Sequence, residues 1–145
     1  MIIEKIKIDN IIQAIIFRTK AKKFNKGTKF ITPTNFSFQI GQFNLSKNYS
    51  IQPHMHKKNE RKITDTSEVL FIKSGILRVD FYNRKKKYLF SELIKENDFI
   101  MFNRGVHGFK VIKKVEMIEI KQGPFKKNKD KLKFKGINET KIRYR

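Results

Sequence analysis

The chain has 145 residues, a net charge of +21 and no cysteine. This length suits one domain with a buried core, and a hydrophobic fraction of 39% is too high for a disordered chain. The absence of cysteine excludes disulfides and thiolate metal sites, so metal ligands must come from His, Asp or Glu. No stretch approaches the ~20 apolar residues that span a bilayer. The alternating first residues lack the pattern of a signal peptide, so we expect a cytoplasmic protein without membrane contact.

The high positive charge raises the question of nucleic-acid binding. The lysines are scattered along the chain, and neither zinc-finger spacing nor a clear helix-turn-helix pattern is present. Lys, Ile, Asn and Phe are all abundant, as expected from an AT-rich genome, so we favour a compositional origin of the charge over a nucleic-acid surface. The charge still favours small anionic ligands.

Hydrophobic periodicity predicts short strands along almost the whole chain. In chain order the candidates are 2–8, 13–19, 37–45, 49–56, 69–73, 76–82, 88–94, 99–102, 107–112 and 115–121. Ser74-Gly75 is predicted to form the turn of a hairpin between the two strands that flank it. In the second of these strands, Leu77, Val79 and Phe81 share one face. Many short strands at regular spacing are typical of a sandwich or barrel.

No internal repeat and no domain boundary is visible. We therefore predict a single domain over 1–145, with a barrel core over about 29–123 and a C-terminal extension over 124–145. The basic run 126–131 is predicted to be a solvated loop. The tail over 132–145 keeps several apolar residues and is expected to pack on the barrel.

The chain contains only three histidines. His54 and His56 are two residues apart, so on a strand both imidazoles point to the same side. His107 follows a glycine-containing turn and can join them only through tertiary folding. Glu68 opens a very apolar strand, where an unpaired carboxylate is costly, and it is the natural fourth ligand. Glu60 is the alternative acid, but no apolar strand follows it, so we favour Glu68.

This constellation resembles the first motif of the cupin family, which runs Gly, five residues, His-x-His, three or four residues, Glu, six residues, Gly. Asn48 stands at the first glycine, His54 and His56 follow at the right distance, and Glu68 is followed by six residues and Gly75. The stretch 57–67 is longer than the family's spacing and is read as an enlarged loop at the barrel mouth.

The second cupin motif runs Gly, five residues, Pro-x-Gly, two residues, His, three residues, Asn. Here Asn97 replaces the first glycine, Asn103 replaces the proline, and Gly105 is kept. His107 comes one residue early, and Val111 stands at the place of the Asn. Both Gly-to-Asn changes are mild, because Asn tolerates left-handed backbone turns. The two motifs together cover about half of the chain.

The resemblance implies an all-β fold, a single cupin-type double-stranded β-helix, or jelly-roll barrel. It implies one divalent metal ion held by His54, His56, Glu68 and His107, and this ligand set suits Fe, Mn, Ni, Zn or Co. The segments EVLFIKSGILRVDFY and HGFKVIKKVEMIEIKQGPF are similar to a group of small bacterial cupins from polysaccharide and nucleotide-sugar gene neighbourhoods. Cupins are often dimers, and the first strands are candidates for a homodimer contact.

The residues around the predicted site suggest a small polar or anionic ligand. Arg61 in the enlarged loop can clamp a carboxylate or phosphate. Gln52 shares strand parity with the paired histidines, Gln122 ends the last strand, and Gln39 is a weaker candidate. Two functions stay open. One is a metal-dependent enzyme, such as an isomerase, an epimerase or a dioxygenase, acting on a sugar or other small polar substrate. The other is a non-catalytic ligand-binding or regulatory module.

Overall fold

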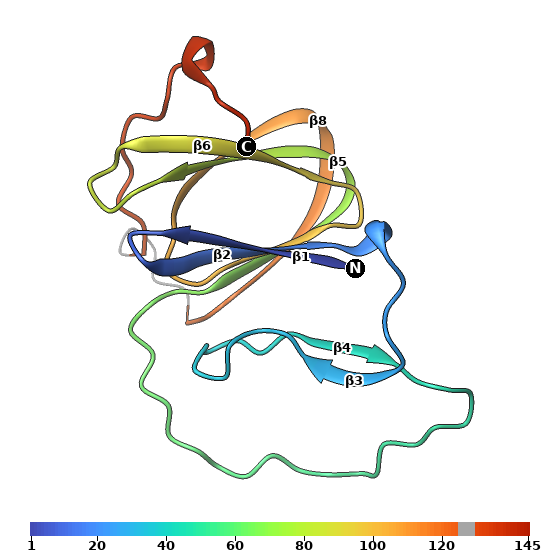
Figure 1. Ribbon diagram of the computed structural model, residues 1–145. Helices are drawn as coiled ribbons and strands as arrows, with labels where there is room; N and C mark the ends of the chain where they lie inside the picture. The colour runs from blue at the N-terminus through green and yellow to red at the C-terminus, as the bar shows by residue number, and fades with distance from the viewer. Residues whose placement is uncertain (125–129) are drawn as a thin grey trace.

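The computed structural model describes residues 1–124 and 130–145, and within them the regular structure is almost entirely antiparallel β-sheet (Figure 1). The strands are β1 (Ile2–Ile8), β2 (Ile11–Arg18), β3 (Gly27–Phe30), β4 (Gly41–Asn44), β5 (Glu68–Tyr82), β6 (Tyr88–Lys95), β7 (Phe99–Phe102) and β8 (Val106–Lys121). Two 3-10 turns, η1 (Thr19–Ala21) and η2 (Glu139–Lys141), complete the elements. The described residues include no helix with the length and apolar character to cross a membrane. The prediction of an all-β fold is confirmed.

One six-stranded sheet carries most of the structure, and β3 and β4 form a separate two-stranded sheet. The order in the large sheet is β1-β2-β7-β5-β6, and β8 pairs with β5. β5 pairs with β7 through its first residues, with β6 through its second half, and with β8 along both parts. Figure 1 shows the large sheet curving around a shared interior, with β1 and β2 opposite β5, β6 and β8.

Two apolar clusters lie on the two faces of this sheet. The inner cluster includes Leu77, Val79 and Phe81, all at most 1% exposed, which confirms the predicted alternation in that strand. An outer cluster is centred on β2 and β7, where residues 31–40 cover the sheet with partly buried apolar side chains. The sheet is therefore buried on both faces in its centre, as the nearly continuous apolar run of β2 requires.

The predicted hairpin at Ser74-Gly75 is wrong, because 69–73 and 76–82 belong to one continuous strand, β5. The predicted strands 107–112 and 115–121 are likewise one strand, β8. Register shifts between the two long strands lie around Gly75, whose φ is +91°. A side chain there would lie 1.9 Å from the carbonyl oxygen of Lys114. The glycine thus marks a β-bulge at which both long strands bend together, and the chain does not reverse.

The two asparagines that replace motif glycines do adopt left-handed backbone conformations, with φ of 67° at Asn48 and 65° at Asn97. Asn tolerates this conformation better than most residues that carry a side chain, as expected.

Two other predicted strands differ from the structure. Of 37–45 only β4 is a strand, because Phe36, Phe38 and Ile40 are used to cover the outer cluster. The predicted strand 49–56 is an exposed segment without regular structure. A strand needs a neighbour to pair with, and sequence alternation alone does not supply one.

The tail packs on the sheet as predicted. Tyr82 holds Phe134 edge to face, with ring centroids 5.1 Å apart. The peptide N–H of Ile137 donates to the Tyr82 hydroxyl at 3.1 Å. Of the loop predicted over 126–131, residues 126–129 lie outside the described part of the chain.

Candidate functional site

Glu68 and His107 lie together in the structure. Glu68 is the first residue of β5, and His107 is the second residue of β8. Glu68 pairs across the sheet with Phe102 of β7, and the His107 ring stacks on that phenylalanine with ring centroids 3.9 Å apart. Phe102 is 1% exposed and belongs to the inner cluster, so the pair lies at one end of the sheet interior. Glu68 itself is 5% exposed, which makes its carboxylate one of the few buried charges of the described chain.

The two side chains are in close contact, but within the described chain one oxygen of the Glu68 carboxylate lacks a hydrogen bond. His107 Nε2 lies 3.2 Å from Glu68 Oε2, within ion-pair distance. Among the described residues, however, that oxygen is buried without a hydrogen bond of acceptable geometry. On the other side of the ring, Nδ1 lies 3.2 Å from the carbonyl oxygen of Gly105, which can only accept, so we assign the Nδ1 proton to this contact.

The surroundings favour the ionised form of Glu68. Contact with His107 lowers the pKa of the Glu68 carboxyl, burial opposes this, and the nearby Lys131 ammonium adds to the lowering. Glu68 is thus an ionised, buried carboxylate, and its Oε1 lies 3.5 Å from the ammonium of Lys131.

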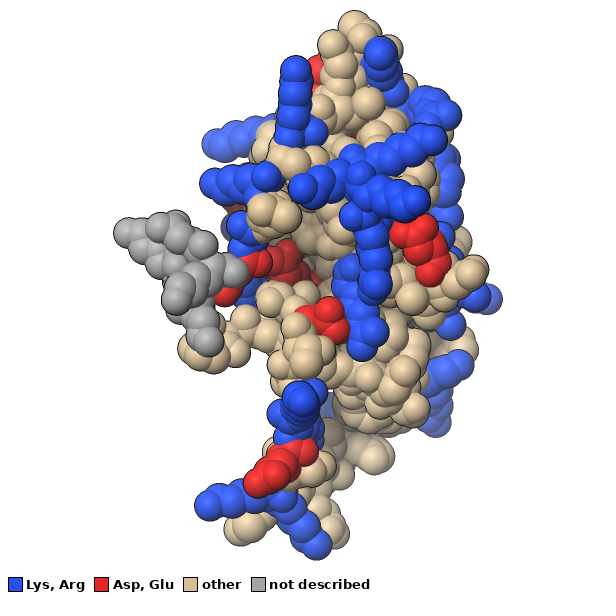
Figure 2. All heavy atoms as spheres, turned by 90° about the vertical axis from the view of Figure 1, so that its left-hand side faces the viewer, with Lys and Arg blue, Asp and Glu red and all other residues tan. Residues whose placement is uncertain are grey.

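A cavity of about 680 Å³ opens beside this pair. Its wall includes Glu68 and His107, the aromatic residues Tyr82, Phe109 and Phe134, and the cations Arg104 and Lys131. This volume suits a small ligand. Figure 2 shows the face of the molecule that looks left in Figure 1, and there Lys and Arg far outnumber Asp and Glu. Such a surface attracts anions.

The other two predicted ligands, His54 and His56, lie elsewhere. Both are exposed, in the extended segment 45–67 that leads to β5 (Figure 1). Their rings face each other edge to face at 5.4 Å, and His54 Nδ1 lies 2.9 Å from the carbonyl oxygen of Gln52. Within residues 1–124 and 130–145, no three His, Asp or Glu side chains are arranged to hold a metal ion. The structure thus contains the predicted ligands as two separate pairs.

Three of the four predicted ligand-binding residues share a second cavity, of about 900 Å³, lined by Arg61, Gln39 and Gln122. The Gln39 amide donates to the carbonyl oxygens of Pro33 and Phe36, and Gln122 Oε1 accepts from the peptide N–H of Ser67 at 2.9 Å. Both amides therefore hold backbone segments in place. The fourth residue, Gln52, lies in the exposed segment beside His54.

Sequence reasoning missed the part of the cavity wall that the tail supplies. Lys131 and Phe134 reach the cavity from the C-terminal segment, and Arg104 comes from the turn before β8. The preserved glycine two residues before His107 was a usable signal for the turn. No local pattern marked the tail residues, because their place depends on how the tail crosses the sheet.

Searches of protein-family models, curated proteins and solved structures found no match to this chain.

Proposed function

We propose that this chain is a metal-binding cupin that holds one divalent ion through Glu68, His107, His54 and His56 and binds a small polar ligand in the adjacent cavity. One observation carries the proposal. The buried Glu68 Oε2 has no hydrogen bond among the described residues, and it faces His107 Nε2 across 3.2 Å beside a cavity. A polar cavity lined by a buried carboxylate oxygen that lacks a hydrogen bond is a candidate binding site.

The pair fits two neighbouring ligands of a divalent ion. Ligand atoms about 2.1 Å from a metal, at right angles to each other, lie about 3.0 Å apart. The observed separation of 3.2 Å is close to this. Metal-bound histidines usually direct their other ring nitrogen to a carbonyl or carboxylate, as His107 does toward Gly105. A set of three imidazoles and one carboxylate oxygen suits Fe, Mn, Ni, Zn or Co.

The other two ligands would arrive with the segment that carries them. β8 has one neighbour, β5, among the described strands, so its second edge is free. Large apolar side chains are exposed along it, namely Phe109, Val111, Ile112, Met117, Ile118 and Ile120. The segment 49–56 exposes Tyr49, Ile51 and Met55. A free apolar edge and an unpaired apolar segment of the same chain form a favourable pair, because their effective concentration is high.

We therefore infer that residues 49–56 add to the free edge of β8 when the metal binds. Addition beside His107 would bring His54 and His56 toward Glu68 and close the curved sheet into the jelly-roll barrel. Metal-driven ordering of this kind is common, because the binding free energy offsets the entropy of the segment.

The cavity suits a sugar derivative or another small polar molecule, with its polar groups at the Glu68 end and its apolar face on the aromatic wall. A bound metal would supply Lewis-acid polarisation of a ligand oxygen, as isomerisation or epimerisation requires. The alternative is a module that binds the same ligand without turnover. Conversion of nucleotide sugars by the metal-loaded protein separates the two.

The test is the metal content of protein purified without a His tag or chelator and then reconstituted with each candidate ion. The wild type is expected to bind one equivalent. The double variant His54→Ala, His56→Ala is expected to lose it while keeping its β-sheet circular dichroism. The variant Lys57→Ala, Lys58→Ala changes two neighbouring exposed side chains of the same segment and is expected to bind normally.

Hydrogen exchange tests the closure. Amide exchange of residues 49–56 is expected to slow on metal addition in the wild type and to stay fast in the double histidine variant. A wild type that retains less than about a tenth of an equivalent after reconstitution ends the proposal.

A further inference from the structure

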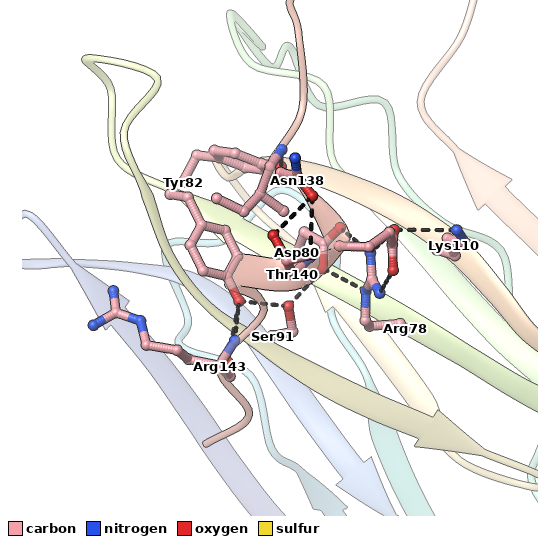
Figure 3. A network of polar contacts seen from close by, with 11 residues as sticks. Arg78, Asp80, Tyr82, Ser91, Lys110, Asn138, Thr140 and Arg143 are labelled. Carbon is pink, nitrogen blue, oxygen red and sulfur yellow. Dashed lines mark hydrogen bonds and ion pairs between the residues drawn. The ribbon is translucent and has the colours of Figure 1, made fainter.

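The C-terminal segment is fixed to the outer face of β5 by a buried arginine (Figure 3). Arg78 is 3% exposed and binds Glu139 through two contacts, Nη1 to Oε2 at 2.7 Å and Nη2 to Oε1 at 3.0 Å. Lys110 of β8 adds a contact of 3.1 Å to the same carboxylate. Asp80 accepts from the Arg78 guanidinium at 2.8 Å. A bidentate pair with a buried guanidinium holds the segment in one register.

The anchored tail lies against the turn that joins β5 to β6. Phe134 of the tail packs edge to face on Tyr82, the last residue of β5. The Lys86 ammonium of the turn lies 5.9 Å from the centre of the same Phe134 ring, in a cation–π contact. Both segments lie on the left-hand side of Figure 1, so Figure 2 looks onto them. Folding thus places the turn 83–87 and the tail side by side, although they are far apart in the sequence.

The two segments carry exposed cations that form no ion pair with an acid of the described part of the chain. We call them the basic surface, and its six members are Arg84, Lys85, Lys86 and Lys87 of the turn and Lys133 and Lys135 of the tail. The carboxylates that adjoin this surface have other partners. Glu139 is bound to Arg78, and Asp130 lies 3.9 Å from Lys121. Asp9 accepts the peptide N–H of Arg84 at 3.3 Å.

Positive charges that lie close together repel one another, and on an exposed surface only water and counterions screen them. A partner that brings several negative charges at once relieves this repulsion and releases the counterions. The backbone under the cations is already ordered, because Arg78 holds the tail and the Asn83 N–H donates to the Lys87 carbonyl oxygen at 3.0 Å. Binding therefore does not have to order the backbone of either segment.

We propose that the basic surface binds the phosphate backbone of a nucleic acid. This inference goes beyond the proposed function, because it needs neither the metal ion nor the ligand of the cavity. A nucleic-acid strand carries one negative charge per nucleotide, so it can contact several of the six cations at once. Attraction between Lys or Arg and phosphates carries no sequence information, so the binding is independent of base sequence.

An anionic membrane is the competing partner, and the basic surface lacks the apolar anchors that a membrane requires. Phe134 is half-buried and is covered by Tyr82 and Lys86. Within residues 83–87 and 130–136, Leu132 is the one large apolar side chain that is exposed. A single apolar group gives only marginal membrane binding, so the charges favour a nucleic acid.

The experiment measures the binding of a fluorescently labelled oligothymidylate by anisotropy over a series of salt concentrations, with a chelator present. The turn variant carries Arg84→Gln, Lys85→Gln, Lys86→Gln and Lys87→Gln. The matched control carries Lys22→Gln, Lys23→Gln, Lys26→Gln and Lys29→Gln, which are exposed and lie between η1 and the end of β3. Both variants lose four positive charges, so a difference between them reports the position of the charges and not their number.

We expect the turn variant to bind about a hundredfold more weakly than the wild type near ~0.1 M salt. The slope of log affinity against log salt should become less steep by up to about 0.7 × 4 = 2.8, because each phosphate contact with a single strand contributes about 0.7. The control is expected to stay within a few-fold of the wild type. The tail variant Lys133→Gln, Lys135→Gln is expected to lose about tenfold in affinity, and it carries the test if the turn variant loses its β-sheet circular dichroism.

Three results would overturn the inference. The first is a wild type that does not bind the oligonucleotide near ~0.1 M salt. The second is an equal loss of affinity in the turn variant and the control, because binding would then depend on total charge alone. The third is a wild type that binds vesicles of phosphatidylserine and phosphatidylcholine but not the oligonucleotide, which would make the basic surface a membrane contact. Since the chelator removes divalent metal, none of these results depends on the proposed metal site.

Discussion

A methyl group added at Gly75 tests how closely the long strands β5 and β8 pack against each other. The change is Gly75→Ala, with Gly27→Ala as control. Both glycines have positive φ, +91° and +97°. A Cβ on Gly27 meets no atom within 4 Å, whereas a Cβ on Gly75 would lie 1.9 Å from the Lys114 carbonyl oxygen. The control therefore isolates backbone strain from the steric clash.

The magnitude follows from these numbers. Positive φ costs a residue with a side chain roughly 1–2 kcal/mol, and this applies to both variants. Real Cβ atoms essentially never approach such an atom closer than 3.0 Å, so β5 and β8 must separate by at least 3.0 − 1.9 = 1.1 Å at the bulge. A shift of that size lengthens the neighbouring ladder hydrogen bonds beyond their working range, and losing two of them costs about 2 kcal/mol. Gly75→Ala should thus lose about 3–4 kcal/mol of unfolding free energy.

The assay is urea unfolding followed by circular dichroism. With a slope near 2 kcal/mol/M, we expect the midpoint of Gly75→Ala to fall by about 1.5–2 M and that of Gly27→Ala by about 0.5–1 M. Equal midpoints for the two variants would refute the reasoning, because the clash with β8 would then contribute nothing.

Two further substitutions test the network under the tail and the inner cluster. Contacts with Arg78 first, and then with Lys110, lower the pKa of Glu139 from 4.5 to about 2. A lowered folded-state pKa stabilises the protein above the unfolded value and loses that effect as the pH falls through the folded value. The melting temperatures of wild type and Glu139→Gln should therefore converge between pH 4.5 and pH 2, and a constant difference would show that the charge of Glu139 is not responsible. Phe81→Ala removes a fully buried ring that packs on Phe90 and Phe102. Urea unfolding should show that the free energy of unfolding falls by about 3–5 kcal/mol. A fall below about 1 kcal/mol would mean that this face of β5 is not part of the core.

The sequence by itself determined the all-β class and the side-chain parity along its apolar strands. The alternation of apolar residues correctly predicted that Leu77, Val79 and Phe81 of β5 share the inward face. Side chains on a strand point alternately to its two faces, so residues two apart lie on the same face. Asn48 and Asn97 were expected to tolerate left-handed turns, and both adopt positive φ.

Only the tertiary structure decided which segments pair. Gly75 looked like a turn, yet it is a bulge, because the difference depends on the strand that lies opposite and not on the glycine. The pairing of Glu68 with His107, and the arrival of Lys131 beside them, join residues far apart in the chain. Such contacts depend on the summed burial of whole strands, and no local pattern encodes them.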